Sequence, residues 1–224
     1  RETNIGGCSN WQIIDLEEGS VRVCEPGALE VGAKSLRIEA TNAIYAKYRW
    51  LGVKQSVSLM TAGESEQEKI TFEEIYVPEP VTVGHAVNIS TAGAIKGGRW
   101  GSNGDHYSST GNIFVQPGWH ETGSAGSINL SAKSVQVGNI NAIGYPNSGQ
   151  LTVNAESAYF EDIALQSVKG WEQDAQGNWS FSDDLARPAN QSLTVNDGIK
   201  YFRARGIYLQ AADDITDVDI TATD

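Results

Sequence analysis

Apolar and polar residues alternate with a period of two along most of this chain. The clearest stretches are residues 20–31, 34–48, 55–60, 80–90, 111–116, 191–197 and 214–222. Such alternation is typical of a β-strand with one buried and one solvent-exposed side. The acidic segment GESEQEKITFEE at 63–74 has no sustained apolar helical face, and the 24 glycines favour turns. The sequence therefore predicts an all-β fold.

The segment GSINLSAKSVQVGNINAIG at 126–144 recurs 23 residues later as GQLTVNAESAYFEDIALQS at 149–167. The corresponding positions are Gly126/Gly149, Ile128/Leu151, Leu130/Val153, Ala132/Ala155, Ser134/Ser157, Val135/Ala158, Val137/Phe160, Ile140/Ile163 and Ala142/Leu165. Residues 34–45 fit the same pattern at an offset of four repeats, which aligns Ala40 with Ala132 and Ala43 with Val135. Residues 55–60 and 191–196 match the first half of the unit.

A repeat of about 20–25 residues predicts a β-solenoid, in which equivalent inward residues of successive units stack on one another. Short alternating strands and glycine turns also occur in a β-sandwich or jelly roll, where such a repeat arises by chance. The sequence is compatible with both architectures. They differ in one respect: a solenoid makes the strands at 127–131 and 150–154 parallel neighbours, about 4.8 Å apart.

The pattern G-x-[IL]-x-[LV]-x-A-x-S-x-x-[VF]-x-[ND]-I in 126–167, and in part in 34–48, resembles the haemagglutinin-type repeats of large secreted bacterial adhesins. The resemblance implies a right-handed parallel β-helix with inserted loops. It also implies an extracellular structural or adhesive role, with copies of the chain or other surface proteins as partners. It implies no catalytic residue.

A second resemblance is to jelly-roll carbohydrate-binding modules of polysaccharide-degrading systems. It rests on the early Trp11, on GAKSLRIEA at 32–40 and on AYFEDIALQS at 158–167. It implies polysaccharide as the partner. The 57 residues after Ser167 are more than a closing strand of such a module leaves.

Two cysteines, Cys8 and Cys24, lie in the first part of the chain. A disulfide between them would stabilise the folded chain by roughly 3 kcal/mol, because it closes a loop in the unfolded chain. It would also indicate an oxidising, extracellular or cell-surface environment. The alternative is two free, buried thiols. We expect an N-terminal cap at 1–33 with this disulfide, and a β-rich body at 34–224 with loop insertions at 95–125 and 168–190.

The formal net charge of −12 argues against nucleic acid and anionic membranes as partners, because binding phosphates requires a basic face. No run of 18 apolar residues occurs, so the sequence predicts no membrane-spanning helix.

The alternation breaks at 95–126, where aromatic and charged residues stand among glycines and serines. The candidate ligand-binding residues are Arg99, Trp100, Tyr107 and Trp119. Aromatic faces flanked by polar groups suit sugar rings. The alternative is that the two tryptophans fold back over the body as a cap.

A second break at 168–188 contains WEQDAQGNWSF, which predicts a hairpin with aromatic strands around an Ala-Gln-Gly-Asn turn. The hairpin either packs on the body or projects as a contact element. Calcium is a candidate ligand for Asp174, Asp183 and Asp184, and for Asp213, Asp214, Asp217 and Asp219 near the C-terminus. The alternatives are a solvated acidic loop and an exposed strand face.

We predict that the protein is not an enzyme and has no cofactor. Three scattered histidines define no nucleophile–base pair, and the carboxylates available for glycoside cleavage are Glu73, Glu74, Glu161 and Asp162. Glu161 and Asp162 occupy the repeat position of Gly138 and Asn139, which indicates a structural position. The predicted function is a structural or adhesive surface protein. LTVND at 193–197 and DITDVDITATD at 214–224 are the candidate strands for pairing with a neighbour.

Overall fold

The computed structural model describes residues 12–16, 19–24, 28–31, 35–40, 42–46, 50–53, 56–72, 74–77, 87–97, 99–100, 107–108, 111–115, 126–145, 149–187, 192–210 and 217–220. These residues form β-strands and the turns between them, and none of them is helical. The predicted all-β class is therefore confirmed. The described part contains no helix long and apolar enough to cross a membrane.

The strands lie on three faces. The first face is a seven-stranded parallel sheet with the spatial order β4, β7, β10, β15, β18, β21, β23. The bounds are β4 (Ser35–Ala40), β7 (Ser56–Thr61), β10 (Val87–Ser90), β15 (Ser127–Ser131), β18 (Gln150–Asn154), β21 (Ser192–Val195) and β23 (Asp217–Ile220).

The second and third faces are joined into one sheet by two long strands, β19 (Ser157–Gln173) and β22 (Tyr201–Gln210). The second face contains β5 (Ala43–Ala46), β8 (Lys69–Phe72), β11 (Ala94–Gly97), β16 (Ser134–Gln136) and the first parts of β19 and β22. The third face contains β6 (Trp50–Val53), β9 (Glu74–Val77), β14 (Asn112–Val115), β17 (Ile140–Gly144) and later parts of β19 and β22.

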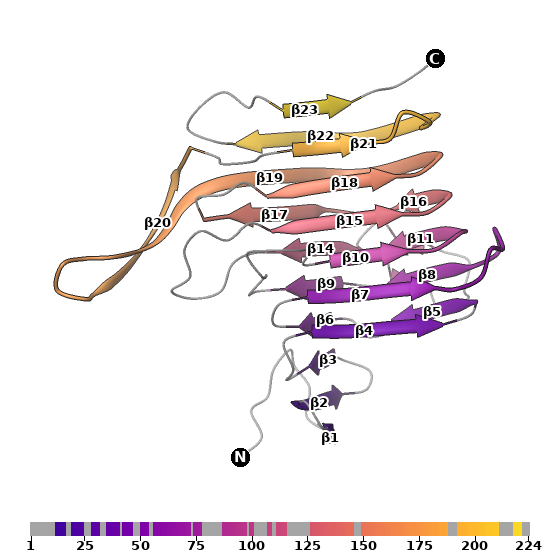
Figure 1. The fold of residues 1–224 in the computed structure, drawn as a ribbon, viewed down its shortest axis with the longest axis horizontal. Helices are drawn as coiled ribbons and strands as arrows, with labels where there is room; N and C mark the ends of the chain where they lie inside the picture. Colours follow the sequence, from indigo (N-terminus) through magenta and orange to yellow (C-terminus); the bar gives the residue numbers. More distant parts are fainter. Residues whose placement is uncertain are drawn as a thin grey trace.

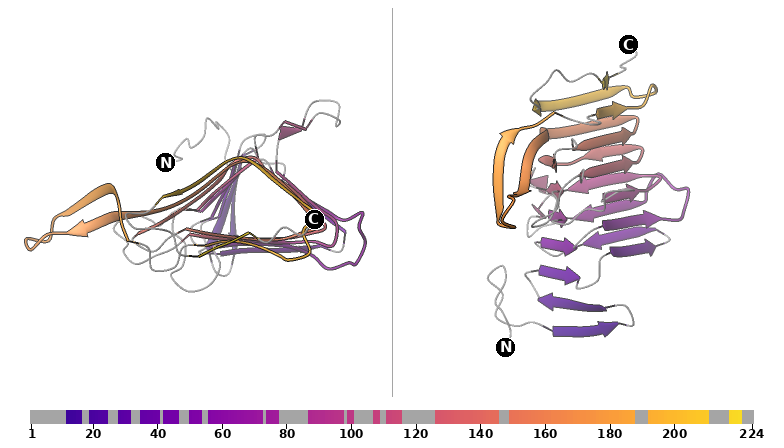
Figure 2. Two further views of the ribbon diagram at one scale, coloured as in Figure 1. Left: turned by 90° about the horizontal axis from the view of Figure 1, so that it is seen from above. Right: turned by 60° about the vertical axis from the view of Figure 1, so that its left-hand side comes forward.

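The chain visits the three faces in a fixed order, β4, β5, β6 and then β7, β8, β9, and each visit is stacked on the one before (Figure 1). Seen along the stack, the strands outline a triangle (Figure 2). The pairing of β15 with β18 is parallel, with Ile128 opposite Leu151 and Leu130 opposite Val153. A jelly roll pairs its strands antiparallel, so this pairing disagrees with the sandwich alternative.

The core consists of rows of equivalent side chains, one from each strand of a face, as the repeat predicts. On the first face one row is Val57, Val87, Ile128, Leu151 and Leu193, all at most 1% exposed. On the third face Ile75, Ile113, Ile140 and Ile163 form another such row. Stacked aliphatic rows of this kind bury the apolar surface that stabilises the fold.

The alignment of Ala43 with Val135 is wrong by one residue. Ala43 lies in the row of Ser134, and Ile44 lies in the row of Val135. The reason is that the corner after Ala40 contains two residues, whereas the corner after Ala132 contains one.

The leading glycine of the repeat is explained by a close approach of backbones. A Cβ on Gly126 would lie 2.8 Å from the carbonyl oxygen of Val115, and one on Gly149 would overlap the carbonyl oxygen of Ala142. The chain passes here from the third face to the first, and only glycine leaves room for the neighbouring strand.

The described strands of the N-terminal segment extend the third face. β3 (Ala28–Val31) pairs parallel with β6, and β2 (Gly19–Cys24) and β1 (Gln12–Leu16) continue the sheet as antiparallel strands. All of β14 and all but the first residue of β11 fall inside the range 95–125 that we predicted as a loop insertion, and both strands belong to the stacked faces. The insertion is therefore divided by β14.

Candidate functional site

The corner between the second and third faces carries a row of polar side chains. The backbone N–H of Asn139 donates to Oδ1 of Asn112 at 3.0 Å, and the N–H of Asp162 donates to Oδ1 of Asn139 at 3.2 Å. Asp162 in turn accepts a hydrogen bond from Nη2 of Arg205 at 2.6 Å, and this carboxylate raises the pKa of Arg205. The [ND] position of the repeat therefore serves to hold successive strands together.

A second set of hydrogen-bonded polar side chains is buried at the corner between the first and second faces. The N–H of Gly93 donates to Oγ1 of Thr91 at 3.4 Å, and the hydroxyls of Thr91 and Thr61 lie 2.7 Å apart. The Thr61 hydroxyl then donates to Oε2 of Glu68 at 2.5 Å. Glu68 is 2% exposed and also accepts the N–H of Ser65 at 3.3 Å. Because its contacts lie within the corner, we assign Glu68 a structural role.

Among the carboxylates considered for glycoside cleavage, Glu74 and Asp162 do not form a pair. Glu74 and Asp162 share a row but are separated by Asn112 and Asn139. Three strand spacings of about 4.8 Å put them about 14 Å apart, beyond the separation that either glycosidase geometry requires. Glu73 lies outside the described residues.

Three of the four predicted ligand-binding residues lie on one small hairpin. β12 (Arg99–Trp100) pairs antiparallel with β13 (Tyr107–Ser108), and Trp100 lies directly opposite Tyr107. This hairpin stands apart from the three faces (Figure 2). Trp119 lies outside the described residues, as does Cys8. The disulfide to Cys24 stays a prediction.

The predicted hairpin around 174–178 is confirmed. β19 continues beyond the third face and pairs antiparallel with β20 (Trp179–Leu185), with Trp171 opposite Phe181 and Gln173 opposite Trp179. This hairpin, residues 168–185, is called the arm below. The arm projects away from the triangular body (Figure 2).

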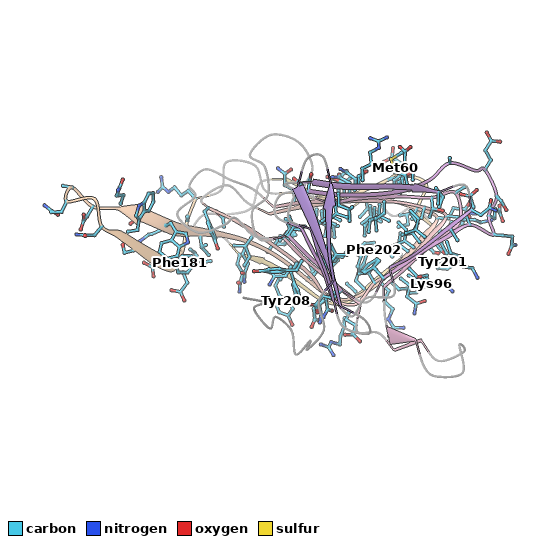
Figure 3. The ribbon with its side chains drawn as sticks, turned by 90° about the horizontal axis from the view of Figure 1, so that it is seen from below. Met60, Lys96, Phe181, Tyr201, Phe202 and Tyr208 are labelled. Atoms are coloured by element: carbon cyan, nitrogen blue, oxygen red, sulfur yellow. The ribbon has the colours of Figure 1, made fainter. Side chains whose placement is uncertain are left out.

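One side of the arm is aromatic. The ring of Phe181 lies 5.4 Å from that of Trp171 and 5.7 Å from that of Tyr145, centroid to centroid, in tilted and edge-on orientations. Phe181 is nevertheless 48% exposed, and Trp179 is 36% exposed. The side chain of Phe181 lies well outside the body in Figure 3. The arm therefore presents two partly exposed aromatic side chains, Trp179 and Phe181, outside the stacked faces.

Tyr145 fixes the base of the arm. Gly170 has a φ of +73°, and a Cβ at this position would lie 2.6 Å from Cγ of Tyr145. The strand register shifts between Val168 and Gly170, so the bend of the arm occurs where the backbone rests on the ring. Burial raises the pKa of the Tyr145 phenol, and the nearby Tyr76 adds to this effect.

The structure does not support calcium at Asp174, Asp183 and Asp184. Asp174 is at the tip of the arm, where its carboxylate accepts hydrogen bonds from Asn178 and from the N–H of Gln176. Asp184 is near the base and lies 3.0 Å from Nζ of Lys169. The tip and base are at least about 14 Å apart at about 3.4 Å per residue, so these carboxylates cannot share one ion. The described residues contain no cluster of three or more metal ligands.

Sequence reasoning missed the outer strand β22. Its outward residues Tyr201 and Tyr208 are 65% and 52% exposed, and Ile207 is 39% exposed. The candidate strand LTVND is not an edge, because β21 lies between β18 and β23. The signal for β22 was available, since its apolar residues repeat the spacing of β19 at an offset of 44 residues.

Comparison of the chain with protein-family models, with curated proteins and with solved structures finds no match in any of the three.

Proposed function

We propose that the chain is a right-handed parallel β-helix with inserted loops, and that it is a non-enzymatic structural or adhesive protein of the cell surface or extracellular space. The observation that carries the proposal is the repeated parallel register from β4 to β23, with aliphatic rows inside and polar rows at the corners. The resemblance of 126–167 to adhesin repeats supports the same role.

The polar side chains at the two corners have structural partners. The row Asn112, Asn139 and Asp162 holds backbone amides, and Glu68 is bonded within its own corner. Apart from Tyr159 on the second face, the most exposed aromatic residues of the described part lie on the arm and on β22. This distribution is typical of a scaffold whose contacts are made by projecting elements and strand edges.

We further propose that such subunits associate through these edges into larger assemblies. Light scattering coupled to size-exclusion chromatography, together with negative-stain microscopy, tests this. We expect the mass to rise with protein concentration and elongated particles to appear. A strictly monomeric species at the highest concentration would rule out self-assembly.

A second candidate is carbohydrate binding, favoured by the pairing of Trp100 with Tyr107 on a hairpin outside the stacked faces. Affinity electrophoresis in gels containing different polysaccharides tests it. Trp100→Ala and Tyr107→Ala should lose retention, while Trp179→Ala on the arm serves as the matched control. Absence of retardation in every polysaccharide, or equal loss in all three variants, would count against this candidate.

A further inference from the structure

β22 is an edge strand in the described structure. It pairs parallel with β19 from Tyr201 to Gln210, and no described strand pairs with its other side. At the next level of the stack the described residues form one strand, β23, on the first face (Figure 1). The second and third faces therefore end at β22 within the described residues.

The inward side chains of β22 are incompletely covered. Phe202, Ala204 and Leu209 pack on the core but are only partly buried, and Ile207 is 39% exposed. One level below, the residues of the same rows are at most 5% exposed: Ala158, Phe160, Ile163 and Leu165. Figure 3 places Phe202 within the triangular outline and Tyr201 and Tyr208 at its outer side. One more strand would bury the inward set to the same extent.

Some backbone groups of β22 face this side, where no described strand pairs with them. The N–H of Tyr201 donates to the carbonyl of Glu156 at 3.3 Å, so the amide of residue 201 points toward β19. Backbone groups alternate sides along a strand. The N–H and C=O groups of Phe202 and Ala204 therefore point to the open side.

The charge of β22 is opposite to that of the chain as a whole. Its sequence, YFRARGIYLQ, contains two arginines and no acidic residue, whereas the chain has a net charge of −12. Arg205 binds Asp162 of the strand below, although its side chain remains 73% exposed. Arg203 makes no ion pair with any described residue. A strand added at the next level would place its own residues beside Arg203 and Arg205.

We propose that the open side of β22 is a strand-addition site for an extended segment of another polypeptide, with apolar residues at alternate positions and Asp or Glu between them. This proposal rests on the proposed scaffold function, in which subunits associate through strand edges, and it names β22 as one such edge. The added strand forms main-chain hydrogen bonds with Phe202 and Ala204, and its acidic residues face the arginines.

β19 supplies the sequence of a suitable probe. Residues 157–166, SAYFEDIALQ, already pair with β22 from below, with Ala158 against Phe202 and Phe160 against Ala204. The rings of Phe160 and Phe202 lie 5.9 Å apart. A peptide of this sequence added from above repeats the same alternation of small and large residues.

The test is fluorescence anisotropy of the labelled peptide SAYFEDIALQ with the intact chain. A control peptide, SAYFKKIALQ, reverses the two acidic positions. In the register of β19 the two changed positions lie at the level of Arg205 and Gly206. We expect the control to bind at least about tenfold more weakly, because like charges then lie beside Arg205. No binding of the first peptide, or equal binding of both, would overturn the proposal.

Two alanine-to-proline variants separate edge binding from adsorption elsewhere. Ala204→Pro removes an N–H on the open side and leaves the bonds to β19 in place, so peptide binding should fall about tenfold or more. Ala175→Pro, in the turn of the arm, is the matched control and should bind as the parent does. Equal affinity in Ala204→Pro and the parent would contradict strand addition at β22.

A charge exchange keeps the test decisive if Ala204→Pro does not fold. Arg205→Glu should weaken SAYFEDIALQ and strengthen SAYFKKIALQ, because residue 205 lies at the level of the first acidic position of the peptide; failure of this exchange would overturn the assignment of acidic residues. The outcome is also distinguishable from that for self-assembly. A monomeric chain that binds the peptide refutes self-assembly alone, whereas assemblies that form without any peptide binding refute the β22 site alone.

Discussion

The carbonyl group of Ala142 occupies the space in which the side chain of residue 149 would begin. Gly149 opens the repeat unit, and the backbone of the third face passes against it with no room for a Cβ. The obstacle is backbone rather than the end of a flexible side chain, so it cannot move aside without disturbing β17. The close packing of residues 126–167 thus requires glycine at position 149.

Gly149→Ala should lower the free energy of unfolding by about 3 kcal/mol or more, because the new methyl group forces two strands apart. Urea unfolding followed by circular dichroism measures the change. Gly198→Ala is the control, since a Cβ there would meet only a side-chain atom of Asn196 at 3.6 Å. Similar losses in both variants would show that the close approach does not matter.

Thr91→Val should cost about 1–3 kcal/mol, because it removes the hydroxyl that joins Gly93 to Thr61 and Glu68 while keeping the shape of the side chain. The unfolding free energy of the variant tests this. Thr152→Val, on the same face of the stack, is the matched control and should stay within about 0.5 kcal/mol of the parent. An unchanged stability for Thr91→Val would contradict the role of the corner.

Acid should loosen the tip of the arm. The side chain of Asn178 lowers the pKa of Asp174 below the ordinary value of 3.8, and the backbone N–H of Asn178 adds to the effect. A lowered pKa stabilises the turn above pH 3.8, and this stabilisation is lost as the pH falls through the folded pKa. A titration by NMR of the Asp174 carboxyl carbon measures it. Asn178→Ala should return the pKa toward 3.8; an unchanged pKa would contradict this hydrogen bond.

Alkali should weaken the base of the arm. Burial raises the pKa of Tyr145 above its ordinary value of 10.0, so the folded state holds the phenol proton more tightly than the unfolded state. The resulting stability is fully present below pH 10 and is lost as the pH rises through the folded pKa. The unfolding free energy of the parent relative to Tyr145→Phe should therefore decline above pH 10. A constant difference between the two proteins would contradict the burial of this phenol.

The sequence predicted the rows but not the complete order of the stack. Residues 126–167 have no insertion, so their period of 23 residues aligned Ile128 with Leu151 correctly. Elsewhere the distance between equivalent residues varies, with 30 residues from Val57 to Val87 and 42 from Leu151 to Leu193. Inserted segments such as the arm lie between the strands and conceal a fixed period.

The position of an edge could not be predicted for the same reason. Alternation identifies LTVN as a strand but does not say that β23 will cover it. Likewise, the aromatic residues of the arm were recognisable, but the contact of Gly170 with Tyr145 joins a residue of β19 to the residue that follows β17. Local pattern specifies which residues point inward; only the completed stack specifies which of them stay exposed.

The continuity of β19 has a mechanical consequence. A single strand runs from Ser157 on the second face to Gln173 in the arm, and its bend is held against the ring of Tyr145. A pull applied at the tip is therefore delivered along covalent backbone into the ladder that β19 forms with β16, β17 and β22. Force on a molecule bound to the aromatic side of the arm would therefore be transmitted to β16, β17 and β22 together.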